Sequence, residues 1–337
     1  MTKLINCILN KDPSCTPVWF MRQAGRYLPE FREIRSQNRN FIKLCLNSTL
    51  SSEITLQPIK RFKLDAAIIF SDILIVPFGL GQEVKFEKNK GPILSLFNLE
   101  FFLKNNEIDF TKKLSPVYEA IKKTRTSLNK EKSLISFVGA PWTLLVYILG
   151  VKTNKNEINY KKINSKKPEV EIILNKLNEY LCLHIQNQIN AGADVVQIFD
   201  SWAGLLPTKD LENYCYTPNR KLVEFCNKNK IPVICFPKGI KENYKDFNIS
   251  VKPDGLNIDY EIDPMWAKQN LTNVSLQGGM DPKILFLSDE EIQARTSKYL
   301  NIFKDTPYIF NLGHGLLPET DPDKVGRLIK FYREYKQ

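Results

Sequence analysis

The sequence predicts an α/β protein, a single-domain (β/α)8 TIM barrel with an active-site cleft at the carboxyl ends of its strands. Three observations lead to this prediction. The chain has 337 residues, enough for two ordinary domains or one large barrel. About eight short apolar or β-branched runs alternate with longer stretches of helical character. No internal repeat and no linker rich in Pro, Gly or Ser divides the sequence, so we expect one domain over residues 1–337.

The expected strands are, in chain order, residues 17–21, 66–70, 134–138, 195–199, 232–236, 255–258, 274–277 and 308–311. Each ends in polar, Gly or Pro residues, as strands commonly do. Helical periodicity is clearest at residues 170–191 and 323–335, where apolar side chains recur on one face. Segment 149–167 has the least orderly pattern, and we expect it to form a lid-like surface insertion after the third strand.

The composition excludes several classes of protein. Hydrophobic residues make up 43% of the chain, which is enough for a packed core and excludes a wholly disordered protein. The best apolar run, residues 66–80, is interrupted by Ser71, Asp72 and Pro77 and falls short of the roughly 18 residues of a membrane span. Much of the net charge of +11 is Lys mixed with Asn and Ile, without the basic and aromatic clusters of nucleic-acid binders. We therefore expect an acidic small-molecule substrate, no nucleic acid and no membrane span.

Histidine and cysteine limit the metal chemistry. The two histidines, His184 and His314, are 130 residues apart, whereas a catalytic zinc site built on two or three histidines needs them together. The seven cysteines include no C-x-x-C pair, which is typical of reduced thiols. The first ten residues lack the pattern of a secretory signal. We therefore expect a cytoplasmic protein without a metal site, in which His184 has a structural role on an apolar helix face.

Residues of chemical interest directly follow the expected strands. They are Arg22-Gln23-Ala24-Gly25-Arg26 after the first strand, Ser71-Asp72 after the second, Gly139-Ala140-Pro141-Trp142-Thr143 after the third, Asp200-Ser201 after the fourth and Gly313-His314-Gly315 after the eighth. In a barrel, these segments meet at one face, which is where the active site lies.

Four arginines, Arg22, Arg26, Arg32 and Arg35, lie within fourteen residues after the first expected strand. A guanidinium group is permanently charged and binds carboxylates through two parallel hydrogen bonds, so this cluster suits a polyanionic ligand. The alternative is that these arginines are surface residues on the first turns of a helix. Gly25 and Pro29 interrupt a smooth helix and favour a shaped loop.

Several motifs resemble a known family. They are MRQAGRYLPEFR at residues 21–32, FSDIL at 70–74, GAPWTL at 139–144 followed by Tyr147, LQG at 276–278 and NLGHG at 311–315. Together they resemble the uroporphyrinogen decarboxylase family, from about residue 17 to the C-terminal helix. The resemblance implies a homodimeric barrel enzyme of haem biosynthesis, a carboxy-lyase that needs no cofactor. It also implies the reaction, conversion of the four acetate side chains of uroporphyrinogen III to methyl groups, which gives coproporphyrinogen III.

The chemistry of that reaction gives Asp72 a role. Loss of carbon dioxide from an acetate leaves an electron pair that most enzymes pass to a cofactor or metal. A pyrrole protonated at its α-carbon can accept the pair instead. A buried carboxylate beside the pyrrole N–H groups would stabilise the cationic ring, and Asp72 is the best candidate in the sequence. The alternative role for Asp72 is that of a helix N-cap.

The resemblance also implies the site residues. Asp72, Arg22 and Tyr147 are implied to be catalytic, with Arg22 a candidate for proton delivery through a bound water. The implied substrate-binding residues are Arg22, Gln23, Ala24, Arg26, Arg35, Asp72, Tyr147, Phe199, Ser201 and His314. After Tyr147, residues 148–154 replace the acidic, Gly-rich segment usual in the family, so we expect a different lid there.

Two alternatives stay open. Corrinoid-dependent methyltransferases share the barrel but activate thiols with zinc held by His and Cys, whereas Cys235 on the fifth expected strand has no neighbouring His. A noncatalytic tetrapyrrole-binding protein would keep the arginines for carboxylates. A pure binder of carboxylates would gain nothing from a buried anion such as Asp72 in its cleft, whereas recognition of a pyrrole requires one.

Overall fold

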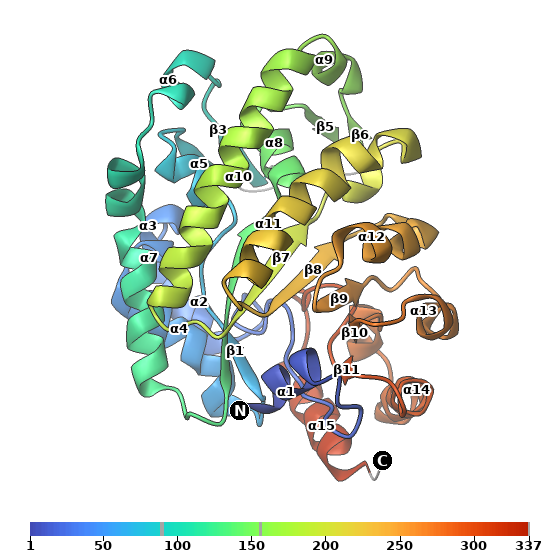
Figure 1. Ribbon diagram of the computed structural model, residues 1–337. Helices are drawn as coiled ribbons and strands as arrows, with labels where there is room; N and C mark the ends of the chain where they lie inside the picture. The colour runs from blue at the N-terminus through green and yellow to red at the C-terminus, as the bar shows by residue number, and fades with distance from the viewer. Residues whose placement is uncertain (88–90, 155–156, 336–337) are drawn as a thin grey trace.

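Seven parallel strands form the central sheet in a computed structural model that describes residues 1–87, 91–154 and 157–335 (Figure 1). In the order in which they lie side by side, they are β1 (Ala66–Ile68), β4 (Ser133–Gly139), β7 (Val195–Asp200), β8 (Val233–Pro237), β9 (Gly255–Ile258), β10 (Ser275–Gly278) and β11 (Tyr308–Ile309). Each neighbouring pair is parallel. The spatial order follows the chain order, as expected when helical crossovers link successive strands.

The segment around Val18 closes the sheet between its edge strands. On one side the Trp19 N–H donates to the Phe310 carbonyl at 3.3 Å, and on the other the Asp65 N–H donates to the Val18 carbonyl at 2.9 Å. The sheet therefore curls into a barrel, and the fold predicted from the sequence is confirmed. The expected strand at residues 17–21 is nevertheless wrong, because only Val18 forms a bridge there. Pro17 has no N–H, and the Asp65 carboxylate accepts the Val18 N–H at 2.8 Å in place of a backbone carbonyl.

Helices pack around the outside of the barrel (Figure 1). They are α4 (Ser48–Arg61), α7 (Glu107–Ser127), α10 (Lys167–Asn190), α11 (Thr217–Lys228), α12 (Tyr244–Val251), α13 (Pro264–Asn270), α14 (Asp289–Ile302) and α15 (Pro322–Glu334). The other α-helices are α1 (Lys3–Leu9), α2 (Pro29–Gln37), α3 (Phe41–Cys45), α5 (Ile75–Gly79), α6 (Leu99–Leu103), α8 (Pro141–Ile148) and α9 (Tyr160–Asn164). Single turns of other helix types lie at Ala203–Leu205, Thr208–Asp210, Glu212–Tyr216, Lys241–Asn243 and Pro282–Phe286. Helices α10 and α15 confirm the two clearest helical predictions.

Two hairpins were not expected from the sequence. One pairs β2 (Val84–Glu87) with β3 (Gly91–Leu94), and the other pairs β5 (Lys152–Asn154) with β6 (Glu157–Ile158). The second hairpin and α9 belong to segment 149–167, of which residues 155 and 156 lie outside the described part. The lid role of this segment stays a prediction.

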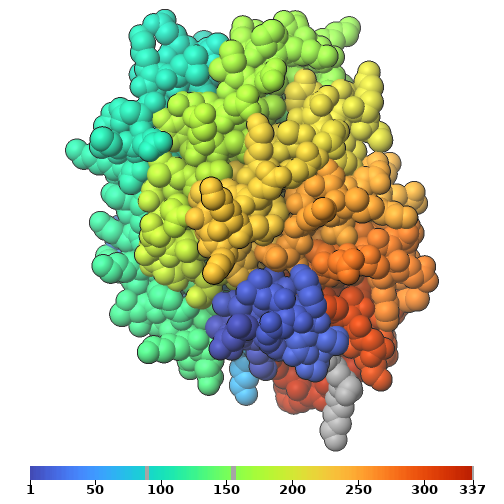
Figure 2. Space-filling model, viewed as in Figure 1, coloured from blue at the N-terminus to red at the C-terminus, as the bar shows by residue number. Residues whose placement is uncertain are grey.

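Two cores hold the fold together. The larger packs the helices against the outside of the sheet. The smaller contains Ile68, Ile135, Val195 and Ile234 from four strands, with Leu4 of α1 beneath them. In the space-filling view the blue N-terminal segment covers this end of the molecule beside the red C-terminal part (Figure 2). The opposite end of the barrel, where the strands terminate, is left for the site.

A buried polar layer also fills the barrel. Gln277 on β10 donates to Gln197 on β7 at 3.1 Å and to Asn257 on β9 at 2.7 Å, and it accepts from the Trp19 indole N–H at 3.0 Å. Because β7 and β10 are not neighbours in the sheet, these side chains point into the barrel. All are fully buried, so their mutual hydrogen bonds offset the cost of removing polar groups from water.

Candidate active site

The first loop of the site carries Arg22, whose φ of +61° is a left-handed conformation that residues with a β-carbon rarely adopt. Buried Gln23 holds this turn: its Oε1 accepts from the Phe20 N–H at 3.0 Å and its Nε2 donates to the Ala66 carbonyl at 3.0 Å. The Tyr27 hydroxyl donates to the Gln23 carbonyl at 2.9 Å. A backbone outlier fixed by buried hydrogen bonds is typical of functional sites.

These bonds bear on the predicted role of Gln23. Its side chain is directed into the protein and bonded to backbone at both ends. A contact between Gln23 and substrate would therefore involve its backbone, as predicted for the half-buried Ala24 beside it.

Arg22 lies directly against the loop after β11. A β-carbon built on Gly315 would come within 2.5 Å of Arg22 Cδ and 2.7 Å of its Cγ. The two loops are also joined by the Leu316 N–H, which donates to the Met21 carbonyl at 2.9 Å. Surrounding protein and the nearby Arg26 lower the pKa of the Arg22 guanidinium, although its side chain keeps contact with solvent. The loop after the Val18 segment and the loop after β11 therefore lie against each other, as expected for a closed barrel.

Asp72 follows β1 and is half-buried. Its Oδ1 accepts from the Leu74 N–H at 2.8 Å. Its Oδ2 has no hydrogen-bond partner in residues 1–87, 91–154 and 157–335. Burial raises the pKa of Asp72 to about 6, while the Leu74 N–H and the charge of Arg22 favour the carboxylate form. At neutral pH Asp72 is therefore mainly a carboxylate with one oxygen available to a ligand.

The helix-cap alternative for Asp72 does not match the local geometry. Helix α5 begins at Ile75, its N-cap residue is Leu74, and no side chain caps it. Asp72 instead bonds the amide two residues ahead, as Asp does in a turn. This turn fixes one carboxylate oxygen and leaves the other for the site.

Tyr147 lies near the end of α8, the helix that follows β4. Its ring contacts Trp202 with centroids 5.9 Å apart. Burial, with a contribution from the charge of Asp72, raises the pKa of Tyr147 to about 12. Its hydroxyl is therefore protonated at neutral pH and can donate a hydrogen bond.

Ser201 and Phe199 lie at the end of β7. Both are half-buried, and the Phe199 ring meets Phe137 edge-on with centroids 5.7 Å apart. Asp200 between them is fully buried and points away from this pair, because its carboxylate accepts from Thr143 at 2.7 Å and from Asn219 at 3.0 Å. The alternation along the strand therefore leaves Phe199 and Ser201 for the site and uses Asp200 for structure.

His314 follows β11 between the buried glycines Gly313 and Gly315. Burial, and then the positive charges of Lys238 and Arg22, lower the pKa of His314 to about 3. The imidazole is therefore neutral at physiological pH, with one nitrogen able to donate a hydrogen bond and the other able to accept one.

The other two arginines predicted for the site, Arg26 and Arg35, are placed differently. Arg26 is exposed, and its charge acts on Arg22. Arg35 lies on α2, where its guanidinium donates to the Asn38 carbonyl and lies 5.6 Å from the centre of the Phe41 ring. The structure therefore places Asp72, Tyr147 and His314 each within electrostatic reach of Arg22, with the charge of Arg26 also acting there and Arg35 held by its own helix end.

The structural role predicted for His184 is confirmed. His184 is buried on α10, with Nδ1 at 2.9 Å from the Tyr118 hydroxyl and Nε2 at 2.6 Å from the Gln188 amide nitrogen. Burial lowers the pKa of His184 to about 3. The imidazole is thus fully engaged within the core.

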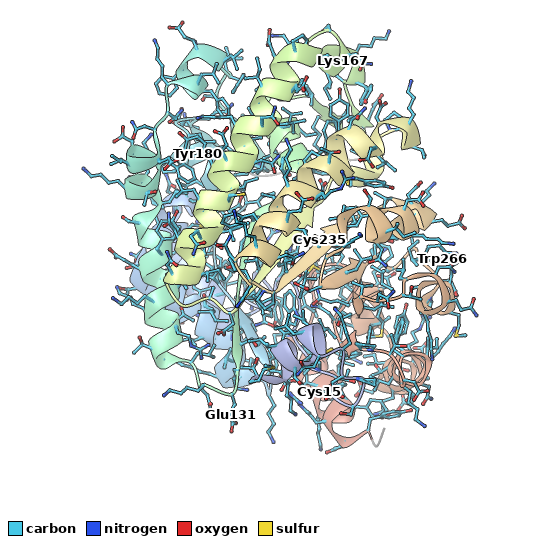
Figure 3. The ribbon with its side chains drawn as sticks, viewed as in Figure 1. Cys15, Glu131, Lys167, Tyr180, Cys235 and Trp266 are labelled. Carbon is cyan, nitrogen blue, oxygen red and sulfur yellow. The ribbon has the colours of Figure 1, made fainter. Side chains whose placement is uncertain are left out.

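The described residues contain no group of three or more His, Cys, Asp or Glu side chains that could hold a metal ion. All seven cysteines are free thiols. Cys235, labelled on β8 in Figure 3, is buried, and desolvation raises its pKa well above the ordinary value. Nor is any helix in the described ranges long and apolar enough to cross a membrane.

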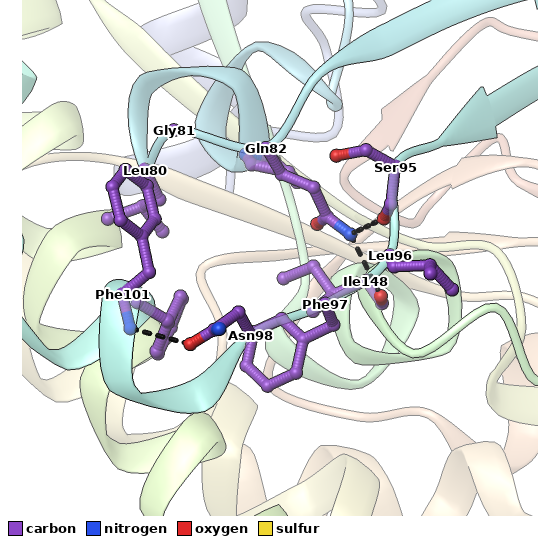
Figure 4. A pocket seen from close by; sticks show the side chains of 11 residues that line it. Leu80, Gly81, Gln82, Ser95, Leu96, Phe97, Asn98, Phe101 and Ile148 are labelled. Atoms are coloured by element: carbon purple, nitrogen blue, oxygen red, sulfur yellow. Dashed lines mark hydrogen bonds between the residues drawn. The ribbon is translucent and has the colours of Figure 1, made fainter.

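A small pocket lies away from these residues, between the β2–β3 hairpin, α6 and the end of α8 (Figure 4). Gln82 crosses it, donating to the Ser95 carbonyl at 2.6 Å and to the Ile148 carbonyl at 3.0 Å. Most of its other lining residues are apolar, and none is a predicted site residue. Because Ile148 follows Tyr147, this contact fastens the hairpin to the helix that carries Tyr147.

Lys238 is a cation at the strand ends that the sequence did not single out. It comes directly after β8, and its charge acts on His314. Its position shortly after an expected strand could have indicated a site residue, as the same kind of position indicated Arg22, Asp72 and Ser201. A chain with 48 Lys and Arg residues makes one lysine inconspicuous.

The fold and the residues at the strand ends define a (β/α)8-barrel enzyme. Among solved structures, a methyltransferase from Methanosarcina mazei has the same fold, with a TM-score of 0.77 and 17% identity over 98% of this chain and 97% of that one. At this identity the likeness concerns the fold alone.

Sequence comparison is more specific. The sequence model of the uroporphyrinogen decarboxylase (URO-D) family matches residues 1–335. The uroporphyrinogen decarboxylase of Rickettsia bellii is 40% identical over 336 residues, 99% of each chain, and that of Orientia tsutsugamushi is 40% identical over 342 residues, again 99% of each. The chain belongs to the uroporphyrinogen decarboxylase family. It is a carboxy-lyase, as predicted, and the full-length match favours this class over the methyltransferase alternative.

Proposed function

We propose that the chain removes carbon dioxide from the four acetate side chains of uroporphyrinogen III, giving coproporphyrinogen III in haem biosynthesis. Family membership over nearly the whole length supports this function. The structural observation that supports it most is the free Oδ2 of Asp72 at the strand ends, surrounded by the charge of Arg22 and the hydroxyl-bearing Tyr147.

In this proposal Asp72 binds the pyrrole N–H groups. A proton first adds to the α-carbon next to the acetate-bearing carbon, and the ring becomes cationic. The adjacent carboxylate stabilises that charge more than it stabilises the neutral ring, which is what lowers a barrier. Burial raises the pKa of Asp72, and the charge of Arg22 lowers it only in part. The carboxylate therefore gains from a second nearby cation, which the protonated ring supplies.

The bond between the acetate methylene and its carboxylate then breaks. Carbon dioxide leaves, and the electron pair neutralises the ring as an exocyclic double bond. A second proton adds to the methylene carbon, and loss of the first from the α-carbon restores the pyrrole with a methyl group. Each turnover therefore consumes one proton net and releases one carbon dioxide. The pyrrole is the electron sink, so this route uses no cofactor.

The remaining residues bind and orient carboxylates. Arg22 and Arg26 bind them as ion pairs, and Arg35 assists from α2. Tyr147, Ser201 and neutral His314 orient them through hydrogen bonds without adding charge. Phe199 packs against a pyrrole face, and the backbone of Ala24 adjoins the ligand. Because burial and Arg26 lower the pKa of Arg22, we also propose that Arg22 delivers the proton through a bound water.

The direct experiment incubates the purified protein with uroporphyrinogen III under anaerobic conditions. Chromatography of the oxidised products should show the successive seven-, six-, five- and four-carboxylate species. Unchanged uroporphyrinogen, with an active relative assayed in parallel, would contradict the proposed function.

The finer properties rest on the family resemblance. We propose a homodimer in the cytoplasm, with segment 149–167 acting as a lid. Light scattering on the purified protein should give twice the chain mass of 39.0 kDa. A monomer at the concentrations used for the assay would contradict the dimer.

A further inference from the structure

Backbone hydrogen bonds fix Lys238 at the strand-end face. Its N–H donates to the Asp200 carbonyl at 3.1 Å, and its carbonyl accepts from the Gly204 N–H at 2.9 Å. The next residue, Gly239, donates its N–H to the Asp259 carboxylate at 2.8 Å. A β-carbon on Gly204 would lie 2.5 Å from the Gly239 carbonyl oxygen, so two backbones pass here in close contact. The backbone of Lys238, and with it the start of its side chain, is therefore fixed in position.

Lys238 differs from other half-buried lysines in the bonding of its ammonium group. Lys238 as a residue is half-buried, and no carboxylate or other acceptor bonds its ammonium group within residues 1–87, 91–154 and 157–335. Other half-buried lysines are bonded: Lys268 donates to the Ile302 carbonyl at 2.6 Å, and Lys324 pairs with Asp289 at 2.9 Å. A ligand anion that reached this ammonium group would gain a charge-assisted hydrogen bond without displacing a protein carboxylate.

The barrel places Lys238 across from the arginine loop. Counting round from the Val18 segment, β8 is the fifth of eight positions, so the end of β8 faces the loop that carries Arg22 and Arg26. His314 lies near both sides, since the charges of Lys238 and Arg22 each act on it. A ligand above Asp72 thus meets positive charge from two opposite directions.

We propose that the Lys238 ammonium binds a propionate carboxylate of the tetrapyrrole substrate, an inference that rests on the proposed function. Propionates fit this role better than acetates, because they survive all four decarboxylations. A cation paired with a reacting acetate would stabilise the ground state and oppose loss of carbon dioxide. A cation paired with a propionate binds each successive substrate and the product alike. Lys238 is therefore a positioning residue that anchors the macrocycle opposite Arg22 and Arg26.

The test compares Lys238→Gln, Lys238→Arg and the control Lys228→Gln, which changes an exposed lysine at the end of α11. Turnover gives kcat and KM for uroporphyrinogen III, and quenching of tryptophan fluorescence under anaerobic conditions gives Kd for coproporphyrinogen III. We expect Lys238→Gln to raise KM and Kd together by roughly 10- to 100-fold, the usual effect of losing a charge-assisted hydrogen bond. The kcat should change little, Lys238→Arg should recover most of the affinity, and the control should match the unaltered protein.

Three other outcomes overturn the inference. Unchanged KM and Kd in Lys238→Gln would remove Lys238 from substrate binding. A raised KM with unchanged Kd for coproporphyrinogen would assign it to an acetate instead, because the product has lost its acetates. A large fall in kcat alone would give it a chemical role. The proposed function fails if the unaltered protein binds coproporphyrinogen but does not turn over uroporphyrinogen. In that case the Kd values for coproporphyrinogen still test the role of Lys238.

Discussion

The Arg22 side chain passes so close to Gly315 that a β-carbon on the glycine would lie 2.5 Å from Arg22 Cδ. These residues come from opposite ends of the chain, and the barrel brings them together where the segment around Val18 meets Phe310. The absence of a side chain at residue 315 is therefore what allows Arg22 its position beside Asp72.

Replacement of this glycine should displace the arginine. We expect Gly315→Ala to lower kcat/KM by roughly 10- to 100-fold, because a displacement of about 1 Å in a positioned group costs about 100-fold. Circular dichroism should show an intact fold. The matched control is Gly326→Ala on α15, where the nearest atom is 3.7 Å from the added β-carbon. This control should keep full activity and gain about 0.5–1 kcal/mol from helix propensity. Full activity in Gly315→Ala would show that Arg22 does not need its observed position.

Gln23 should matter to stability. Gln23→Ala leaves the Phe20 N–H and the Ala66 carbonyl without partners in a buried setting. We expect a loss of about 2 kcal/mol or more in the free energy of unfolding, since each orphaned group costs about 1–3 kcal/mol. Urea denaturation measures it. Gln293→Ala, at an exposed position on α14, should change stability by less than about 0.5 kcal/mol. Equal stability of the two variants would contradict the role assigned to Gln23.

The two histidines should both stay neutral in the folded protein. The pKa values of His184 and His314 are lowered to about 3, mainly by burial. NMR of protein labelled in histidine should therefore show two imidazole signals that do not titrate between pH 8 and pH 5. In urea both should titrate near the ordinary value of about 6.5. Since the unfolded chain alone binds these protons, both histidines reduce stability as the pH falls below about 6.5. A His314 signal that titrates near 6.5 in the folded state would contradict its neutral role in the site.

Asp72 should have the opposite effect on stability. Its pKa is raised from 3.8 to about 6, so the folded protein binds its proton more tightly than the unfolded chain does. The ionised carboxylate therefore costs stability at pH 7, and this cost disappears as the pH falls from about 6 towards 3.8. We expect Asp72→Asn to unfold at a higher temperature than the unaltered protein at pH 7, with the difference shrinking by pH 4.5. A lower unfolding temperature for Asp72→Asn at pH 7 would contradict this assignment.

The placement of most candidate site residues at the strand ends could be predicted because a barrel brings its strand ends together. Arg22, Asp72, Tyr147 and His314 each follow a different strand or its helix, and in the structure the charge of Arg22 acts on each of the other three. The fold itself follows from the alternation of short apolar runs and helices. The strand at residues 17–21 was wrong because a side chain, Asp65, takes the place of a backbone partner, and no pattern of hydrophobicity reports that.

Other features depend on contacts that sequence spacing does not reveal. Gln23 lies between Arg22 and Arg26 in a motif predicted to bind substrate, yet its side chain turns inward to two backbone groups. The polar layer inside the barrel joins Gln277, Gln197 and Asn257 from separate strands. Lys238 could be identified only because its ammonium group has no partner among the residues that the structure describes, whereas other half-buried lysines are bonded.

Turnover of uroporphyrinogen III by Asp72→Asn tests the central claim most directly. The substitution keeps the size of the side chain and its bond to the Leu74 N–H, and removes the charge that would stabilise a protonated pyrrole. We predict a fall in kcat of about 100-fold or more, the usual cost of losing a main electrostatic contact in a transition state, with the fold retained. A kcat within a few-fold of the unaltered protein would show that the anion of Asp72 is not what makes the pyrrole an electron sink.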